Sequence, residues 1–311
     1  MDKFRFDGKV VVITGAGRGL GLGYAEYLAK LGAAVVVNDL GGGVAGDGSD
    51  ASVAESVAQA IRADGGSAIA SSADIACESG ASSLVQAAVS EFGHLDAVIN
   101  NAGITAGHQF PEISVADVQR HLDVHVMGTF LVTRAAWPHL AKSSSGRVLN
   151  TISGAIFGSA PALPYTTAKG AVLGMTKALA EAGAPLGIKV NGISPSAKTR
   201  MIGLAENRRG IDWPDDVPML ARHTMDVAPV AAYLVHERCP VSGQFFFADS
   251  GRVAHLVLGE TRGGVADDRT VESIHGMWDR VLDADGFVTP ASTVEHRKLA
   301  DEVLAEARGI D

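Results

Sequence analysis

Short runs rich in valine and isoleucine alternate along this chain with stretches of helical periodicity. In the stretch 52–66, for example, Val53, Val57 and Ile61 fall at helical spacing, and Gly65 marks the end of the helix. Strands that alternate with crossover helices form a parallel sheet whose two faces are covered by helices. The sequence therefore predicts an α/β chain with a doubly wound sheet of seven parallel strands, formed by the runs KVVVITG, AAVVVND, SAIASSAD, LDAVINNAG, GRVLNTIS, IKVNGIS and GQFFFADSG.

The length of the chain allows one large α/β domain or two ordinary ones, because 311 residues with 47% hydrophobic side chains can bury a sizeable core. The last predicted strand ends near residue 251, so we expect residues 1–251 to form the main domain. Residues 196–225 have no clean periodicity and are expected to form a lid. Residues 252–311 are expected to form a C-terminal extension that packs on the core or on a neighbouring subunit.

The charge of the chain narrows the class of partner. A net charge of −9 without a dense Lys/Arg block argues against a nucleic-acid or anionic-membrane surface and favours small molecules. Cys77 and Cys239 lie far apart and match no ligand spacing, so we expect neither a disulfide framework nor a metal site. The sequence shows no basic leader before an apolar run and no apolar stretch of membrane length. These features predict a cytoplasmic protein in a reducing compartment.

A glycine-rich segment, TGAGRGLG at residues 14–21, follows the first predicted strand and precedes the helical stretch YAEYLAKLG. Glycines there permit a tight turn and a close backbone approach to a pyrophosphate, whose charge is favoured by the N-terminus of the next helix. A glycine-rich turn can be mere turn chemistry, but its position between strand and helix favours a phosphate site. The pattern predicts a Rossmann-type dinucleotide fold with cofactor contacts from Gly15, Arg18, Gly19, Leu20 and Gly21.

The second predicted strand ends in Asp39, 18 residues after Gly21. A dinucleotide fold places an acid near this position, on the adenosine ribose hydroxyls. Because a carboxylate there would repel the 2′-phosphate of NADP, the expected cofactor is NAD. Two alternatives stay open. Asp39 could simply begin the loop DLGGGVAGDGSD, and the guanidinium of Arg18 could bind a 2′-phosphate and favour NADP.

The segment PYTTAK places Tyr165 and Lys169 four residues apart, on one face of a helix if the segment is helical. Ser153 ends the fifth predicted strand, at the edge of the sheet where open α/β folds bind ligands. The Lys169 ammonium, a cationic nicotinamide and the N-terminus of the helix that Pro164 introduces would all favour the phenolate of Tyr165. Tyr165 could then take a proton from an alcohol while Ser153 holds the substrate oxygen. The alternative is a surface pair without a role in proton transfer.

Together, TGAGRGLG, the NNAG of residues 100–103, Ser153, YTTAK and VNGISP occur in an order that resembles the classical short-chain dehydrogenases/reductases. The resemblance spans residues 8–251. It implies an oxidoreductase that acts on a CH–OH group with a nicotinamide cofactor, and it implies that Tyr165 and Lys169 also contact that cofactor, Lys169 through the nicotinamide ribose. The further cofactor contacts that it implies come from Leu40, Asp74, Ile75, Asn101, Ala102, Gly103, Pro195, Ala197 and Thr199.

A narrower resemblance is carried by VVVNDLGG, DVHVMGTFLVTRAAW and ISPSAKTRM. These segments are similar to the (3R)-hydroxyacyl-CoA dehydrogenase part of the peroxisomal multifunctional enzymes type 2 and to its free-standing bacterial relatives. The resemblance implies the interconversion of a 3-hydroxyacyl-CoA and a 3-oxoacyl-CoA, in lipid or steroid metabolism. Open alternatives are a steroid or other bulky-alcohol dehydrogenase, an NADPH-dependent 3-oxoacyl reductase and, from another class, a nucleotide-binding sensor without turnover.

Two features depart from the usual pattern of the family. His125 stands where most members have Asn, whose family role is to hold a water that relays protons to the lysine. An imidazole with a pKa near neutrality could do the same, so His125 is a catalytic candidate beside its reading as a helix residue with a purely structural role. The spacing of 12 residues between Ser153 and Tyr165 is shorter than usual in the family.

Two further expectations concern partners. Basic residues in and after the lid could bind the phosphates of CoA or simply form a solvated surface: Arg200, Arg208, Arg209, Arg222 and His223. The stretches GTFLVTRAAWPHL and GAVLGMTKALA have more apolar positions than one core face needs, and the family pairs these helices across a two-fold axis. A homodimer or homotetramer is therefore expected.

Overall fold

A computed structural model of the chain describes residues 4–105, 110–197, 223–266, 268 and 270–308. The chain divides into two compact units, Met1–His255 and Leu256–Asp311. Among the helices that the described residues form, none is long and apolar enough to cross a membrane.

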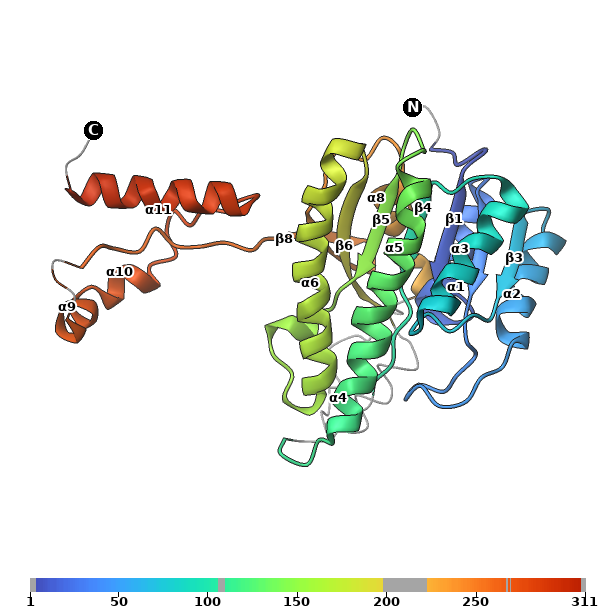
Figure 1. Ribbon diagram of the computed structural model, residues 1–311, viewed down its shortest axis with the longest axis horizontal. Coiled ribbons are helices and arrows are strands. Elements are labelled where there is room, and N and C mark those ends of the chain that lie inside the picture. The colour runs from blue at the N-terminus through green and yellow to red at the C-terminus, as the bar shows by residue number, and fades with distance from the viewer. Residues whose placement is uncertain (1–3, 106–109, 198–222, 267, 269, 309–311) are drawn as a thin grey trace. The chain divides into compact units, whose positions relative to one another are not determined.

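The first unit is built around a sheet to which the described residues contribute eight strands, in the order β3-β2-β1-β4-β5-β6-β7-β8 (Figure 1). The strands from β1 to β7 pair in parallel; Val12, for example, lies opposite Val36 on one side and Val98 on the other. The strand order reverses between β1 and β4, which is where open α/β sheets bind ligands at their carboxyl edge. The strands are β1 (Val10–Thr14), β2 (Ala34–Asn38), β3 (Ser67–Ser71), β4 (Ala97–Asn100), β5 (Arg147–Thr151), β6 (Lys189–Ser196), β7 (Phe245–Asp249) and β8 (Arg252–Leu256).

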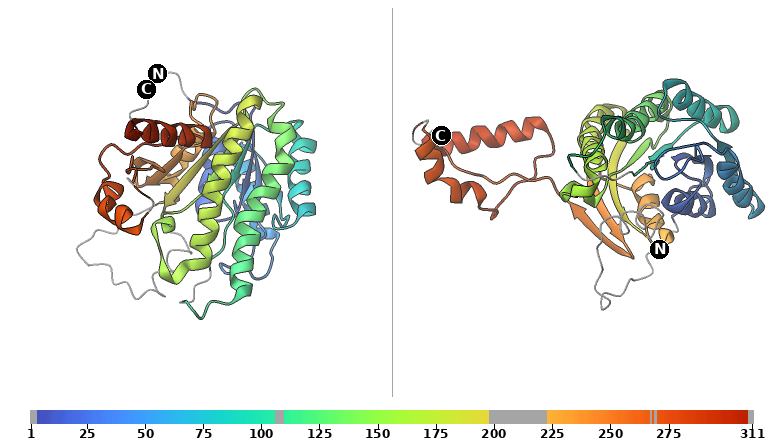
Figure 2. Two further views of the ribbon diagram at one scale, coloured as in Figure 1. Left: turned by 60° about the vertical axis from the view of Figure 1, so that its left-hand side comes forward. Right: turned by 90° about the horizontal axis from the view of Figure 1, so that it is seen from below.

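Helices cover both faces of the sheet, as the two halves of Figure 2 show from different sides. One layer consists of α1 (Gly19–Lys30), α2 (Ser52–Ala63) and α8 (Ala228–Val235). The opposite layer contains α3 (Glu78–Phe92), α5 (Gly128–Leu140) and α6 (Leu163–Gly183). Helix α4 (Val115–His121) continues through a π-helical turn, η1 (Leu122–Met127), into α5. Short 3-10 turns are η2 (Gly154–Phe157), η3 (Ala160–Ala162), η4 (Ala184–Leu186) and η5 (Thr224–Asp226).

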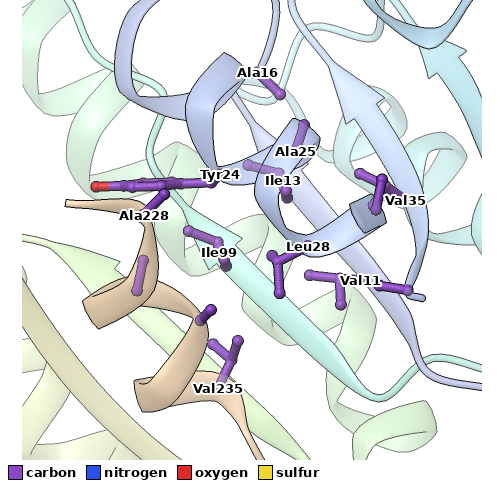
Figure 3. Packing of buried hydrophobic residues seen from close by; sticks show 14 of the residues in the cluster. Val11, Ile13, Ala16, Tyr24, Ala25, Leu28, Val35, Ile99, Ala228 and Val235 are labelled. Atoms are coloured by element: carbon purple, nitrogen blue, oxygen red, sulfur yellow. The ribbon is translucent and has the colours of Figure 1, made fainter. Parts of the chain in front are cut away.

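The alternation of side chains along the strands produces two cores. Val11 and Ile13 of β1 point to the layer of α1 and α8, whereas Val10 and Val12 point to the opposite layer. Figure 3 shows the first core, in which Leu28 of α1 lies among side chains of β1 and α8. Strands that are buried on both faces read as continuous apolar runs, which explains why the sequence indicated them so clearly.

The sheet differs from the expected seven strands by one strand. Two residues, Ser250 and Gly251, connect β7 to β8, and both have positive φ angles, of 46° and 83°. A two-residue connection with two positive φ angles is a hairpin turn, so β8 runs antiparallel to β7. The expected parallel, doubly wound architecture is confirmed, and β8 adds an edge strand to it.

The second unit contains α9 (Val271–Gly276), α10 (Trp278–Leu282) and α11 (Thr293–Arg308). None of its described residues is buried. Several large apolar side chains are strongly exposed, among them Val271 (80%), Trp278 (49%) and Leu282 (64%). A unit of this size with no buried apolar side chain among its described residues lacks the core that independent stability requires.

Candidate active site

The glycine-rich loop is tied to the segment that follows β4. The hydroxyl of Thr14, the last residue of β1, accepts hydrogen bonds from the amides of Asn101 (3.0 Å) and Ala102 (3.1 Å). The side-chain amide of Asn101 donates to the carbonyls of Thr14 and Gly15, both at 3.0 Å. The side-chain amide of Asn101 is used in these hydrogen bonds to the backbone, so its contribution to a cofactor site is to hold the loop in shape.

Two glycines of the loop are required by close packing. Gly15 has a φ of 62°, and a Cβ there would lie 2.7 Å from the Cα of Ala102. A Cβ on Gly21 would lie 2.2 Å from the carbonyl oxygen of Gly15. Gly19, with a φ of 58°, begins α1, and Leu20 packs against the core under that helix. The loop thus forms a narrow turn that ends at a helix N-terminus, which is the cradle that a pyrophosphate needs.

The carboxylate of Asp39 lies between the glycine-rich loop and the loop that follows β2. It accepts hydrogen bonds from the amides of Gly17 (2.9 Å) and Gly41 (2.7 Å). The guanidinium of Arg18 donates to the carbonyl of Gly42 at 3.2 Å. Asp39 therefore begins its loop, as one alternative predicted, and also sets a negative charge beside the glycine-rich turn. Leu40 follows it and is partly buried.

Asp74 and Ile75 lie in the connection between β3 and α3. The side-chain amide of Asn38, at the end of β2, donates to the carbonyls of Ser71 and Ala73 and holds this connection beside β2. The carboxylate of Asp74 accepts from the amide of Ala76 at 2.9 Å, and Ile75 is buried. Both residues thus lie next to β2, the strand that Asp39 follows.

Ser153, Tyr165 and Lys169 come together at the carboxyl edge of β5. Ser153 follows β5 and caps η2, where its hydroxyl accepts from the amide of Ala155 at 3.1 Å. The phenol of Tyr165, on the first turn of α6, lies beside the Ser153 hydroxyl, which acts to lower the pKa of the phenol. The ammonium of Lys169 donates to the carbonyl of Thr151 at 2.6 Å and lies 5.7 Å from the ring centroid of Tyr165.

Burial sets the protonation of this group. Burial lowers the pKa of Lys169 to about 7. Burial also raises the pKa of Tyr165, and the hydrogen bond with Ser153 opposes this effect only in part. The sequence led us to expect a phenolate supported by a full lysine charge. In the structure, the residues of the chain alone favour the neutral phenol, because the phenol is itself buried and the buried ammonium beside it is easily deprotonated.

His125 holds the end of the β4 segment. Its Nε2 lies 3.2 Å from the amide and 2.9 Å from the carbonyl of Ile104, and Gly103 packs on the ring so closely that a Cβ there would lie 2.5 Å from Cε1. The ring meets that of Tyr165 edge-on at 5.3 Å and stacks on that of His121 at 5.9 Å. The π-helical turn that carries His125 directs it inward, as such turns do at many functional sites.

The expected near-neutral pKa of His125 is wrong. Burial, with a further contribution from the charge of Lys169, holds its pKa well below the ordinary value of a histidine. The imidazole is therefore neutral at physiological pH and cannot exchange protons by cycling through a cation. Its Nδ1 is buried and has no hydrogen-bond partner among the residues that the structure describes. The geometry shows His125 as a contact of Ile104 and Tyr165.

The end of β6 contributes Pro195 and Ala197. Pro195 lies opposite Ala248 of β7, and Ala197 is buried. Thr199 and most of the expected lid, with Arg200, Arg208, Arg209 and Arg222, lie outside the described residues. The amide of His223 donates to the carboxylate of Asp226 at 3.1 Å, as part of a capping box at the start of η5.

The structure also identifies residues that the sequence did not single out. Thr14 pins the segment after β4, Thr151 supplies the carbonyl that holds Lys169, and Ile104 is the partner of His125. Thr14 had a readable signal, a hydroxyl residue at the carboxyl end of a strand. The other two act through backbone groups, which carry no signature in the sequence.

Comparison with known proteins places this geometry in context. The sequence pattern described as short chain dehydrogenase matches residues 9–208. The chain is 37% identical over 305 residues to the peroxisomal multifunctional enzyme type 2 of Mus musculus, which covers 96% of this chain and 40% of that enzyme. It is 36% identical over 280 residues to a short-chain type dehydrogenase/reductase of Mycobacterium tuberculosis, covering 89% of this chain and 95% of that protein.

Among solved structures, the full-length peroxisomal multifunctional enzyme type 2 of Drosophila melanogaster has a TM-score of 0.78 and 28% sequence identity, and covers 97% of this chain and 50% of that chain. The chain therefore spans half or less of the multifunctional enzymes and nearly the whole of the mycobacterial relative.

Proposed function

This chain belongs to the short-chain dehydrogenase family, and on that premise we propose that it is an NAD-dependent oxidoreductase that interconverts a secondary alcohol and a ketone. The observation that carries the proposal is the meeting of Ser153, Tyr165 and Lys169 at the sheet edge that also holds the glycine-rich loop. A non-catalytic sensor would need the loop alone.

The residues of the chain have distinct roles in the proposed reaction. In the direction of oxidation, Tyr165 removes the hydroxyl proton of the substrate, and the Ser153 hydroxyl holds the substrate oxygen. Lys169 is held on Thr151 and places its charge beside the phenol. The cofactor, when bound, supplies the hydride acceptor and, in its oxidised form, a positive charge that favours the phenolate. His125 keeps the ring of Tyr165 and the backbone of Ile104 in place.

Two observations support NAD rather than NADP. The carboxylate of Asp39 lies where the adenosine ribose is expected, and a 2′-phosphate would have to approach that charge. The guanidinium of Arg18, the group that could welcome such a phosphate, is directed to the carbonyl of Gly42. The adenine is assigned to the side of Asp74 and Ile75.

We propose a 3-hydroxyacyl-CoA as the substrate. The support is the similarity to multifunctional enzymes over nearly the whole chain, together with the character of the loop between Ser153 and Tyr165. That loop contains no charged residue, and its Phe157 is 78% exposed. An exposed aromatic side chain beside a reacting site suits an apolar acyl chain. It would also suit a steroid ring, which is why that alternative is kept.

The experiment that tests the function is a screen of the purified protein with NAD and NADP against 3-hydroxyacyl-CoA thioesters of several chain lengths and against hydroxysteroids. Reduction of NAD by an acyl-CoA, lost on Tyr165→Phe, would support the proposal. Turnover of steroids alone, or with NADP alone, would replace it by one of the alternatives. No turnover with any of them would favour the sensor.

We also propose a homo-oligomer in which the C-terminal unit buries its apolar side chains against the core or a neighbouring subunit. The exposure of Val271, Trp278 and Leu282 supports this assignment. A cytoplasmic location stays a prediction, consistent with the two cysteines, neither of which forms a disulfide.

A further inference from the structure

Residues 41–50, called the strap below, connect β2 toward α2 and fold back on themselves. The amide of Asp50 donates to the carbonyl of Leu40 at 2.9 Å and joins the two ends of the strap. Within it, the amide of Gly43 donates to the carbonyl of Asp47 at 2.7 Å. A compact surface loop with joined ends is an Ω-loop, a class that frequently carries function. The conformation of the strap is therefore held by hydrogen bonds between its own backbone groups and at its two ends.

The tip of the strap contacts the segment that follows β4. The carbonyl of Val44 accepts a hydrogen bond from the amide of Thr105 at 2.9 Å. Gly46, with a φ of 84°, packs so closely that an added Cβ would lie 3.1 Å from Cγ2 of Ile104. The strap thus joins the end of β2 to the extension of β4.

Arg120, in the last turn of α4, makes a third contact with the tip. Its Nη1 donates to the carbonyl of Ala45 at 3.3 Å, and its Cδ would lie 3.6 Å from a Cβ on Gly46. The Arg120 side chain therefore donates to the tip of the strap and also covers it. It reaches the tip from α4, a third element besides β2 and β4.

The path of the strap crosses the glycine-rich loop. In the sheet, β1 lies between β2 and β4, and neighbouring strands are about 4.8 Å apart, so the strap spans roughly 10 Å above the carboxyl end of β1. Its base is bonded to that loop, since the carbonyl of Gly42 accepts from Arg18. A dinucleotide in this fold lies across the same edge, with its pyrophosphate at the glycine-rich turn.

Resting on the proposed function, we propose that the strap closes over the bound dinucleotide and that Arg120 is a positioning residue that fastens its tip. Arg120 acts on the cofactor only through the carbonyl of Ala45 and the packing of Gly46. Loss of this fastening frees the tip and speeds the departure of the cofactor, because affinity changes within one binding site fall mostly on the dissociation rate.

The test is fluorescence titration and stopped-flow dissociation of NADH from the full chain. Arg120→Met keeps the aliphatic part of the side chain and removes the donor. We expect it to raise the Kd for NADH about three- to tenfold, the worth of one such hydrogen bond. The KM for the alcohol and the melting temperature without cofactor should stay unchanged. Arg120→Lys, which keeps a donor, should recover most of the affinity.

Two matched controls separate fastening from general damage. Arg134→Met removes an exposed arginine of α5 that pairs with Glu78, and should leave NADH binding unchanged. Gly46→Ala and Gly48→Ala introduce a side chain at positive φ angles of 84° and 72° in the same strap, but only at Gly46 does the new Cβ meet Ile104. Gly46→Ala should therefore weaken NADH binding, and Gly48→Ala should change it less than about twofold.

Two results would overturn the proposal: NADH binding by Arg120→Met that equals the parent, or an equal loss on Gly46→Ala and Gly48→Ala. The outcome is separable from that of the proposed function. A parent that binds NADH with the expected dependence on Arg120 but oxidises no alcohol would remove the function and leave the strap. A parent that oxidises 3-hydroxyacyl-CoA with no dependence of NADH affinity on Arg120 would do the reverse.

Discussion

The ammonium of Lys169 lies 5.7 Å from the ring centroid of Tyr165, and both side chains stand on the same face of α6. The lysine is only 4% exposed, and its ammonium is held by the carbonyl of Thr151. Among the described residues no carboxylate accepts a hydrogen bond from this ammonium, and a buried cation without such a partner costs stability. The fold keeps it beside a phenol, which is the arrangement that the proposed proton transfer uses.

Because burial of the Lys169 ammonium costs free energy, the stability of the protein should depend on pH. Burial lowers its pKa from 10.5 to about 7, so between these values the unfolded chain binds a proton that the folded chain does not. The free energy of unfolding of the parent should therefore rise with pH from about 7 to 10.5. Lys169→Met should remove this slope and stabilise the protein at pH 7 by on the order of 1–3 kcal/mol. Urea unfolding of the parent and the variant at pH 7 and 9.5 measures the free energy of unfolding of each. An equal change of this free energy with pH in the two proteins would contradict the prediction.

The carboxylate of Asp39 is expected to decide between NAD and NADP. NAD should bind at least about tenfold more tightly than NADP, because the 2′-phosphate would be repelled by the carboxylate. Asp39→Asn removes the charge and keeps one of the two acceptor oxygens that serve the amides of Gly17 and Gly41, so it should reduce this preference. Titration of both proteins with both cofactors tests it. If the parent binds the two equally, the acid has no such role and Arg18 becomes the candidate determinant.

Phe157 predicts a preference for apolar substrates. Phe157→Ser should raise the KM for a long-chain 3-hydroxyacyl-CoA by about tenfold, since the apolar contact is lost, and should leave the KM for NAD unchanged. Phe130→Ser is the control, because Phe130 is also partly exposed but lies on α5 under Arg134. A similar rise in both variants would show that the effect is not local to the loop after Ser153.

The exposed surface of α6 around Gly174 is expected to lie in the interface of a homo-oligomer. Gly174 is exposed, and no atom of the described residues lies within 4 Å of an added Cβ, so a larger residue fits there in a single chain. We expect a dimer or tetramer by light scattering at micromolar concentration, and we expect Gly174→Arg to dissociate it while the helix content is kept. A parent that is monomeric under these conditions would contradict the expectation.

Much of the fold was readable because its signals are local. The apolar strands, the turn from Thr14 to Gly21 and the helix that begins near Pro164 all depend on residues close in sequence. The eighth strand was missed because RVAHL has little alternation and lies at an edge, where one face needs no apolar side chains.

The parts that sequence could not reveal depend on contacts between distant segments. The low pKa of His125 follows from burial among α6, η1 and the segment after β4, which the chain brings together only on folding. For the strap, the sequence indicates only a loop, because its contact with Thr105 is a bond between two backbone groups. Neither burial between distant segments nor a bond between backbone groups leaves a pattern of residues in the sequence.

The most direct test of the account is the turnover of Tyr165→Phe on a substrate that the parent oxidises well. The substitution removes the proton acceptor and keeps the ring that packs on His125. Turnover should fall by roughly 10² to 10⁴, the amount that general-base catalysis supplies, while NAD binding stays nearly unchanged. Burial raises the pKa of Tyr165 in the chain alone, and the positive charge of bound NAD should outweigh this effect. Oxidation by the parent should therefore rise with pH through an apparent pKa below the roughly 10 of free tyrosine, because the phenol must be deprotonated to act. Near-parental turnover of Tyr165→Phe would contradict the dehydrogenase mechanism and reduce the pair of Tyr165 and Lys169 to a structural contact.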